Sequence, residues 1–378
     1  MLKASERRTL RVWRYPKGIP SINFVLGAGL LIRLQERFLK VKIRILSKVF
    51  VVSLLLAGLS TAAVPKTRRG ATATTRQSLL SKLPTSDAVA QVNVKRVLSE
   101  ALPKLLAGNS AKLAEIDSQI EQFKTRTSLD LRSFDELALG MRYSYPSAGI
   151  TKINTVAVAR GAFNTGAIIA AGRVAANGKY REEKYLGKTI YIFTLDQQLK
   201  LLGVLDLKIT ELAVTPLDAN TLALGDAERV RNTIAASREK RRFNAELIDL
   251  ASQDPNAIVG FGGNVSAELI RNLRIGNEAI AKDLASVRQT YGSLAMTDKD
   301  LELLVAARTV DPSSARSLGD TVEGLKQFGA LFTNRLSGIR GVLARSALGN
   351  LKITTQGNEL KIRTAVAQSD VAPLVGGL

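Results

Sequence analysis

The sequence predicts an α+β protein made of two similar units, each an antiparallel-rich sheet with helices packed on one face. Three observations lead to this fold class. Segments in which apolar and polar residues alternate are interleaved with segments whose apolar residues recur every three or four positions. Short runs of Gly, Asn and Asp separate neighbouring alternating segments, which favours hairpins and antiparallel pairing. The order of these elements repeats once along the chain, which indicates a two-fold internal duplication.

The first unit is expected over residues 79–253. Residues 110–127 are its strongest helix candidate, because their apolar residues lie three and four apart and Ser110 can cap the first turn. Pro103 weakens the helix expected before it. The strands expected in this unit are 88–94, 136–145, 153–160, 179–185, 189–195, 211–216 and 221–224, and the helices are 79–83, 95–106, 110–127, 162–176, 227–237 and 245–252.

The second unit is expected over residues 254–378, after a break at Gln253-Asp254-Pro255. Its opening segment, 257–264 (AIVGFGGN), repeats the first strand of the first unit. A closing hairpin is predicted across Gln356-Gly357-Asn358. The strands expected here are 257–264, 292–296, 301–307, 348–355 and 359–367, and the helices are 266–273, 277–288 and 311–344.

The composition narrows the possible chemistry. The 378 residues include no histidine and no cysteine, which removes imidazole bases, Ser-His and Cys-His nucleophiles, Cys/His zinc sites and disulfides. Carboxylate acid–base chemistry, a Ser-Lys pair or an oxygen-ligand metal site remain possible. We expect no cofactor.

An export signal is predicted over residues 41–63. Lys42, Arg44 and Lys48 precede an apolar run at 49–59, and small residues including Ala62 and Ala63 form the cleavage region. Eleven helical residues rise only about 16 Å, too short to span a bilayer. Residues 64–78, which are small, polar and basic, are interpreted as a linker.

Residues 1–40 precede this signal, and we interpret them as an over-extended N-terminus, with initiation at Val41. Two alternatives remain open. Arg7-Arg8 and the apolar run 22–32 could form a twin-arginine-like signal of their own. The two apolar runs could also anchor the protein as an uncleaved membrane segment.

The position of the charge decides how the net charge of +21 is interpreted. Residues 1–63 contain 12 Lys or Arg and two Glu, a net +10, whereas the rest contains 42 basic and 31 acidic residues, a net +11. Much of the excess therefore lies in a segment that export would remove. The remaining charge favours weak attraction to anionic surfaces over a nucleic-acid groove.

One basic cluster is a candidate anion contact. It consists of Arg238, Lys240, Arg241 and Arg242, after a predicted helix and just before the second unit. Phosphate, a lipid headgroup or an acidic glycan could bind there. The alternative is a solvated linker, because cations are favoured at helix C-termini by the dipole alone.

Three further patterns favour a structural interpretation. Gly260-Phe261-Gly262-Gly263 lacks phosphate-loop spacing and indicates close backbone approach. Asp298, Asp300 and Glu302 would share one strand face but sit at a hairpin, where Asp is favoured. The Ser78-Leu79-Leu80-Ser81-Lys82 run lacks the other elements of a Ser-Lys enzyme.

The segment Leu83-Pro84-Thr85-Ser86-Asp87-Ala88 before a strand, together with the export signal and the repeated layout, resembles exported bacterial proteins of unknown function. The resemblance spans roughly residues 80–370 at the level of layout. It implies an exported α+β protein and carries no catalytic residues.

We therefore expect a periplasmic or extracellular, non-enzymatic protein that works as an envelope-associated binding or structural module. An envelope polymer, lipid headgroups or another envelope protein are the expected partners. Two alternatives stay open: a hydrolase using Asp/Glu or Ser-Lys chemistry, and a binder of anionic surfaces or nucleic acid.

Overall fold

The computed structural model describes residues 79–371, apart from 128–129, 202–204, 240–243, 274, 334–335 and 337. The predicted over-extended N-terminus (1–40), signal peptide (41–63) and linker (64–78) lie outside the described residues, and so do Ala62 and Ala63.

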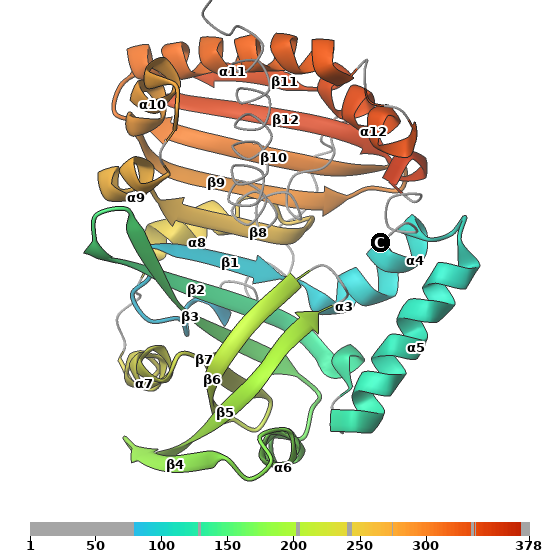
Figure 1. The fold of residues 1–378 in the computed structure, drawn as a ribbon, viewed down its shortest axis with the longest axis vertical. Coiled ribbons are helices and arrows are strands. Elements are labelled where there is room, and N and C mark those ends of the chain that lie inside the picture. The colour runs from blue at the N-terminus through green and yellow to red at the C-terminus, as the bar shows by residue number, and fades with distance from the viewer. Residues whose placement is uncertain are drawn as a thin grey trace, which may run out of the picture. The chain divides into compact units, whose positions relative to one another are not determined.

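A single antiparallel sheet of 12 strands organises the described part of the chain (Figure 1), in the order β11-β12-β10-β9-β8-β1-β2-β3-β7-β6-β5-β4. The protein is therefore α+β, as the sequence predicts. The strands are β1 Ala88–Val92, β2 Phe134–Ser147, β3 Ile150–Gly161, β4 Tyr180–Tyr185, β5 Lys188–Leu201, β6 Leu205–Asp218, β7 Thr221–Gly225, β8 Ala257–Asn264, β9 Val287–Met296, β10 Asp300–Thr309, β11 Lys352–Gln356 and β12 Glu359–Ala367.

The sheet is continuous across the predicted unit boundary at residue 253. Strand β1 pairs with β8 in antiparallel register, with Ala90 opposite Phe261. On either side of this pair the order is mirrored: β2 and β9 come next, then β3 and β10, then β7 and β12. This symmetry is compatible with duplication, and the division into two units stays a prediction.

Helices flank both faces of the sheet, whereas the sequence predicts helices on one face only. Alternation places Val156 and Val158 of β3 on one face, packed with α7 and α8, and Ala159 on the other, packed with α6. Both faces of these strands carry apolar side chains, so helices must pack on both faces to bury them. The helices are α3 Val94–Arg96, α4 Leu102–Leu105, α5 Ser110–Thr127, α6 Thr165–Ala175, α7 Ala227–Ala236, α8 Ala245–Ala251, α9 Ala267–Asn272, α10 Glu278–Ala285, α11 Pro312–Thr333 and α12 Gly338–Gly349, with a π-helical turn at Val97–Ala101 and a 3₁₀ turn at Leu131–Ser133.

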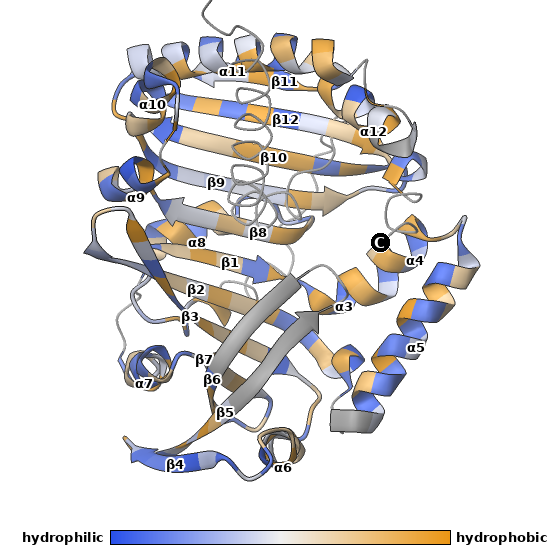
Figure 2. Ribbon diagram, in the orientation of Figure 1, coloured by the Kyte–Doolittle hydropathy of each residue, from blue (hydrophilic) through white to orange (hydrophobic). Residues whose placement is uncertain are grey.

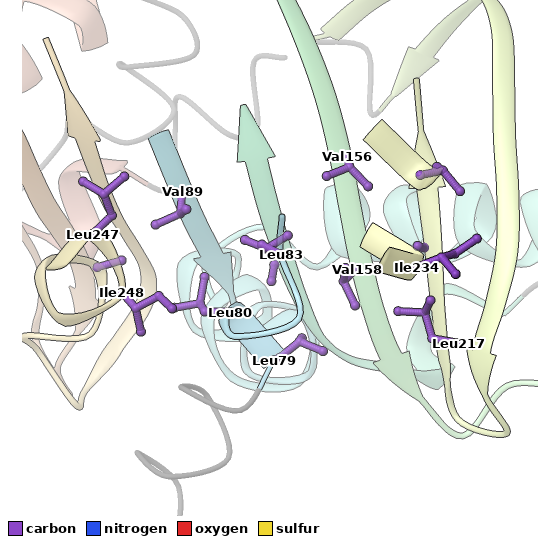
Figure 3. Close-up of a cluster of buried hydrophobic side chains, with 14 of the residues drawn as sticks. Leu79, Leu80, Leu83, Val89, Val156, Val158, Leu217, Ile234, Leu247 and Ile248 are labelled. Atoms are coloured by element: carbon purple, nitrogen blue, oxygen red, sulfur yellow. The ribbon is translucent and has the colours of Figure 1, made fainter. Parts of the chain in front are cut away.

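The largest core lies between the sheet and α7, α8 and the segment that precedes β1 (Figure 3). Leu79, Leu80 and Leu83 are fully or almost fully buried there, against side chains of α7 and α8. Tyr291 and Ala306, from β9 and β10, belong to the same cluster. The core therefore joins residues from both predicted units.

Several element boundaries differ from the sequence prediction: β5 and β6, for instance, are longer than the expected 189–195 and 211–216, and two further differences follow from packing. The helix expected at 277–288 ends at Ala285, because Val287 is buried against Leu318 and Leu360 as part of β9. The strand expected at 348–355 starts only at Lys352, since α12 continues to Gly349.

The helix expected at 95–106 continues past Pro103. The π-helical turn lies just before this proline, where Leu102 N–H bonds to Val97 O, five residues back. This wider turn precedes a residue that lacks an N–H and would disturb a regular α-helix.

Candidate functional site

The predicted anion cluster is only partly described. Arg238 lies exposed after α7, and its guanidinium donates a hydrogen bond to Leu186 O in the β4–β5 turn. Lys240, Arg241 and Arg242 lie outside the described residues. Arg238 thus ties α7 to a neighbouring turn, and anion binding by the cluster stays a prediction.

The glycines of β8 permit close packing of α8. A Cβ atom on Gly260 would lie 2.1 Å from Ala251 O, and one on Gly262 would lie 2.8 Å from Leu247 O. Both distances are shorter than a Cβ contact allows. This is the close backbone approach that the sequence predicts at this position.

The acidic residues after β9 form a hairpin turn. Thr297 Oγ1 accepts a hydrogen bond from Asp300 N–H at 2.9 Å. The exposed Asp298 carboxylate pairs with Lys104 Nζ at 2.9 Å, and this hydrogen bond lowers the pKa of Asp298. Within the described ranges, no group of three or more acidic side chains could hold a metal ion.

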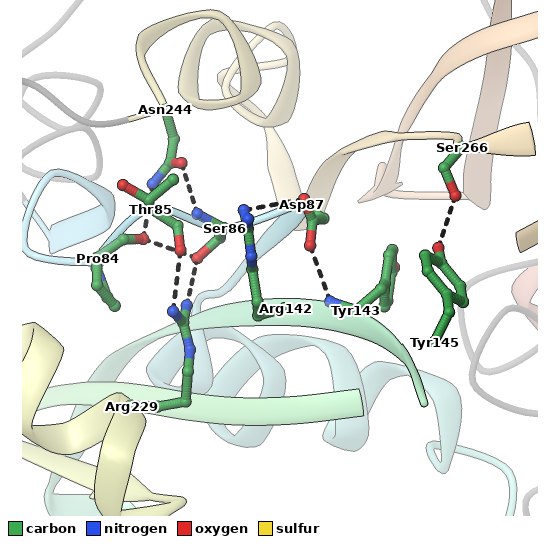
Figure 4. Close-up of polar contacts among 10 residues, drawn as sticks. All are labelled: Pro84, Thr85, Ser86, Asp87, Arg142, Tyr143, Tyr145, Arg229, Asn244 and Ser266. Carbon is green, nitrogen blue, oxygen red and sulfur yellow. Dashed lines mark hydrogen bonds and ion pairs between the residues drawn. The ribbon is translucent and has the colours of Figure 1, made fainter. Parts of the chain in front are cut away.

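The Leu83–Ala88 segment is held by two residues from distant parts of the chain (Figure 4). The Asn244 side chain accepts from Ser86 N–H at 2.8 Å and donates to Pro84 O at 3.0 Å. Arg229, only 4% exposed, donates to Thr85 O at 2.9 Å and to Ser86 Oγ at 2.8 Å. These contacts fix the entry into β1 and are structural.

Asp87 completes this network on the side of β2 (Figure 4). Its carboxylate accepts from Tyr143 N–H at 2.8 Å and pairs with Arg142 at 3.2 Å. Burial, with the Asp87 charge, raises the pKa of the Tyr143 phenol to about 12. Tyr143 therefore stays protonated at neutral pH.

The Ser-Lys pattern is only partly described. Lys82 Nζ lies 3.4 Å from a carboxylate oxygen of Asp218, and Ser78 lies outside the described residues.

A polar cleft of about 500 Å³ lies at one end of β9, β10 and β12. Its lining residues are Glu246, Arg288, Gln289, Arg308, Thr309, Gln356, Asn358 and Glu359. Glu359 accepts from Tyr291 Oη at 2.8 Å and pairs with Arg308 at 3.1 Å and with Lys361 at 2.7 Å.

Opposing effects act on the Glu359 carboxylate in this cleft. Burial alone would raise its pKa, but hydrogen bonds from Lys361, Tyr291 and Arg308 outweigh it, and the pKa of Glu359 is lowered. A carboxylic acid that donates a proton in hydrolysis needs a raised pKa instead. The cleft is thus organised as an ion-pair network.

A large exposed apolar surface lies on α11, α12 and the connection between them. We call it the α11–α12 apolar face. It consists of Leu325, Phe328, Leu331, Phe332, Leu336 and Val342. Leu331 is 67% exposed and Phe328 is 59% exposed. The end of α11 next to α12 is rich in apolar residues (Figure 2).

The spacing along α11 explains why these side chains share a direction. At about 100° per residue, Leu325, Phe328 and Phe332 fall within an arc of about 60°. The Phe328 and Phe332 rings contact each other, with centroids 4.7 Å apart. Leu318, which packs against the sheet, lies seven residues before Leu325 and therefore only about 20° from it around the helix. The exposed apolar side chains thus continue the apolar side of α11 past the part that the sheet covers.

Specific contacts join α12 to the C-terminal end of α11 and to Leu336. Arg345 of α12 donates to Thr333 O at 2.9 Å and to Leu336 O at 3.1 Å. A Cβ atom on Gly341 would lie 2.0 Å from Leu336 O, so only glycine allows this approach. The exposed apolar side chains consequently sit on a defined helical hairpin.

The charged residues of this region are all basic. Residues 324–358 contain five basic residues and no Asp or Glu. They are Lys326, Arg335, Arg340, Arg345 and Lys352. This run of basic residues is visible in the sequence, but the exposure of the apolar residues is not, because periodicity does not show how far along α11 the sheet covers the helix.

Comparisons with known proteins identify no family for this chain. No known family model matches the chain, and no curated protein matches it. Among solved structures, the chain is similar to TP0453 in crystal form III, with 9% identity and a TM-score of 0.40 over 79% of this chain and 98% of that one. Crystal form IV gives 10% identity and a TM-score of 0.39 over 78% and 95%. Similarity at this level supports no conclusion on function.

Among the described residues, no helix combines the length and apolar character needed to cross a membrane.

Proposed function

We propose that this protein is exported to the cell envelope and works there by binding, with the α11–α12 apolar face as its working surface. The observation that carries this proposal is the exposure of six large apolar side chains on one helical hairpin. Such a surface lowers solubility when it is left in water, so its presence indicates a partner.

Export is supported by the sequence of residues 41–63, in which a basic stretch, an apolar run and small residues follow one another. A binding role is supported by the contacts within the hairpin, because Arg345 joins α12 to the end of α11 and Gly341 lies close to Leu336 O. A preformed surface loses little conformational freedom when it binds.

Fractionation of a bacterial host that expresses the full chain tests this function. We expect the chain in the envelope, with its N-terminus after Ala63 by mass spectrometry. The variant Phe328→Asp/Leu331→Asp should shift from the membrane-associated to the soluble fraction. An uncleaved chain in the cytosol would contradict export.

Val174→Asp is the matched control. Val174 is 75% exposed on α6, so an exposed apolar side chain is replaced by Asp away from the hairpin. Equal release of both variants, or of neither, would show that the α11–α12 apolar face is not the working surface.

A further inference from the structure

We infer that the partner of the α11–α12 apolar face is the surface of an anionic lipid bilayer, into which the hairpin inserts its apolar side chains. This inference rests on the proposed function and names its partner class.

The side chains on the hairpin are of the type that enters a lipid interface. Phe328, Leu331 and Phe332 are large and apolar, and they project from the last turns of α11. An amphipathic helix with such a stripe lies in the plane of the interface, with its apolar residues below the headgroups. The mutual contact of the two Phe rings leaves both side chains about half exposed or more.

The charge of the same segment selects the kind of bilayer. Five basic residues and no acidic one occur between Glu323 and Glu359. Basic residues beside an inserted helix are attracted to phosphate-bearing headgroups, by an amount that corresponds to roughly fivefold in affinity per residue. A protein partner would also cover the apolar side chains, but the basic residues of this segment favour a negatively charged surface.

The packing of the hairpin on the sheet explains how insertion leaves the fold intact. Leu318 and Val322 of α11 pack against β11 and β12, while Leu343 and Ala347 of α12 pack against β10 and β12. The outward apolar side chains make no part of these cores. The hairpin can therefore enter an interface without giving up its packing on the sheet.

A site-specific label tests insertion directly. The chain has no cysteine, so Leu331→Cys in the full chain carries a single environment-sensitive fluorophore. With vesicles of phosphatidylglycerol and phosphatidylcholine, we expect the emission to shift to the blue and to be quenched by lipid-attached quenchers. Vesicles of phosphatidylcholine alone should give a much smaller change. The same label at Val174→Cys should not respond, even if residues before the described part also bind lipid.

Two unlabelled variants separate the contribution of the apolar side chains to lipid binding from that of the basic side chains. Phe328→Ser/Leu331→Ser should lower partitioning onto anionic vesicles by roughly tenfold or more. Lys326→Gln/Arg340→Gln should lower it by roughly fivefold per charge at low salt, and by less at high salt. Urea unfolding checks that both variants keep the stability of the parent chain.

Three outcomes overturn the inference. One is an unchanged label at position 331 when the protein binds anionic vesicles. A second is equal response to anionic and neutral vesicles. A third is a change from dimer to monomer in Phe328→Ser/Leu331→Ser, which would make a second copy the occupant. If envelope association in cells still depends on this face while purified protein ignores vesicles, the proposed function stands and the lipid partner is wrong.

Discussion

At the scale of single residues, the most demanding positions are those where backbone segments approach closely. Gly260 faces α8 at the centre of the sheet, next to Gln91, whose side chain donates to Ala251 O at 3.1 Å. The same carbonyl oxygen is the atom that a Cβ on Gly260 would strike. One residue thus decides how near α8 can lie to the pair β1–β8.

Gly260→Ala should therefore destabilise the protein. The added methyl would meet Ala251 O at 2.1 Å, and both backbones belong to packed elements, so we expect a loss of about 1–3 kcal/mol in the free energy of unfolding. Urea unfolding measures this loss. Gly324→Ala is the control: it adds a methyl in α11 with no atom within 4 Å and should stabilise by about 1 kcal/mol. A neutral Gly260→Ala would mean that α8 moves freely on the sheet.

At this scale, the sequence predicts the role of a residue where neighbouring residues determine that role. The glycine run in β8 was interpreted as close approach because its spacing was wrong for phosphate, and α8 provides that approach. The roles of Arg229 and Asn244 could not be predicted. Their partners in Leu83–Ala88 lie more than 140 residues away, and nothing in either local sequence marks the pairing.

At the scale of elements, Glu359 links three neighbouring strands. Tyr291 of β9, Arg308 of β10 and Lys361 of β12 all bond to its carboxylate. Arg308 also lies over the Tyr291 ring, 5.6 Å from its centroid. The network joins these strands at one end, beside the polar cleft.

This network makes stability depend on pH in a defined direction. Since the pKa of Glu359 is lowered on folding, its contribution is complete above the ordinary value of 4.5 and is lost as the pH falls through the lower folded value. Glu359→Gln should cost about 1–3 kcal/mol at neutral pH and make the acid side of the stability profile shallower. Tyr291→Phe removes one of the three donors to Glu359, so its profile of stability against pH should lie between those of the parent chain and Glu359→Gln. Urea midpoints from pH 7 down to pH 3 give the comparison, and parallel profiles for parent and Glu359→Gln would rule out this role.

Most elements were predictable, and the exceptions have tertiary causes. Periodicity identified β8, β12 and α5 with their observed bounds. The start of β9 was missed because Val287 is placed in the sheet by Leu318 and Leu360, which are distant in sequence. For α11, periodicity predicted a helix but not the exposure of apolar side chains near its C-terminal end, since only the packed structure shows how much of the helix the sheet covers.

At the scale of the whole described chain, the two predicted units share a continuous sheet and a common hydrophobic core, so neither unit has a complete core of its own. Strand β1 fills the edge of β8, and α8 covers a face to which Tyr291 and Ala306 contribute. By the predicted boundary at 253, α8 and β1 belong to the first unit, whereas β8, Tyr291 and Ala306 belong to the second. The strand order is mirrored about the β1–β8 pair, but the core contains residues from both sides of this pair.

Unfolding of the full chain should therefore be a single cooperative transition over residues 79–371. Fluorophores on Val174→Cys and Leu331→Cys, one in each half, should report the same urea midpoint, because the core and the sheet are continuous between them. Residues 254–378 expressed alone should not fold, since β8 would present an unpaired edge and Tyr291 would lose its cover from α8. Two separated midpoints, or a folded 254–378 fragment with dispersed amide resonances, would instead establish the boundary at residue 253 as a true domain boundary. The pairing β1–β8 would then be a docking contact between independent domains, and Gly260→Ala should weaken that docking without lowering the midpoint of either half.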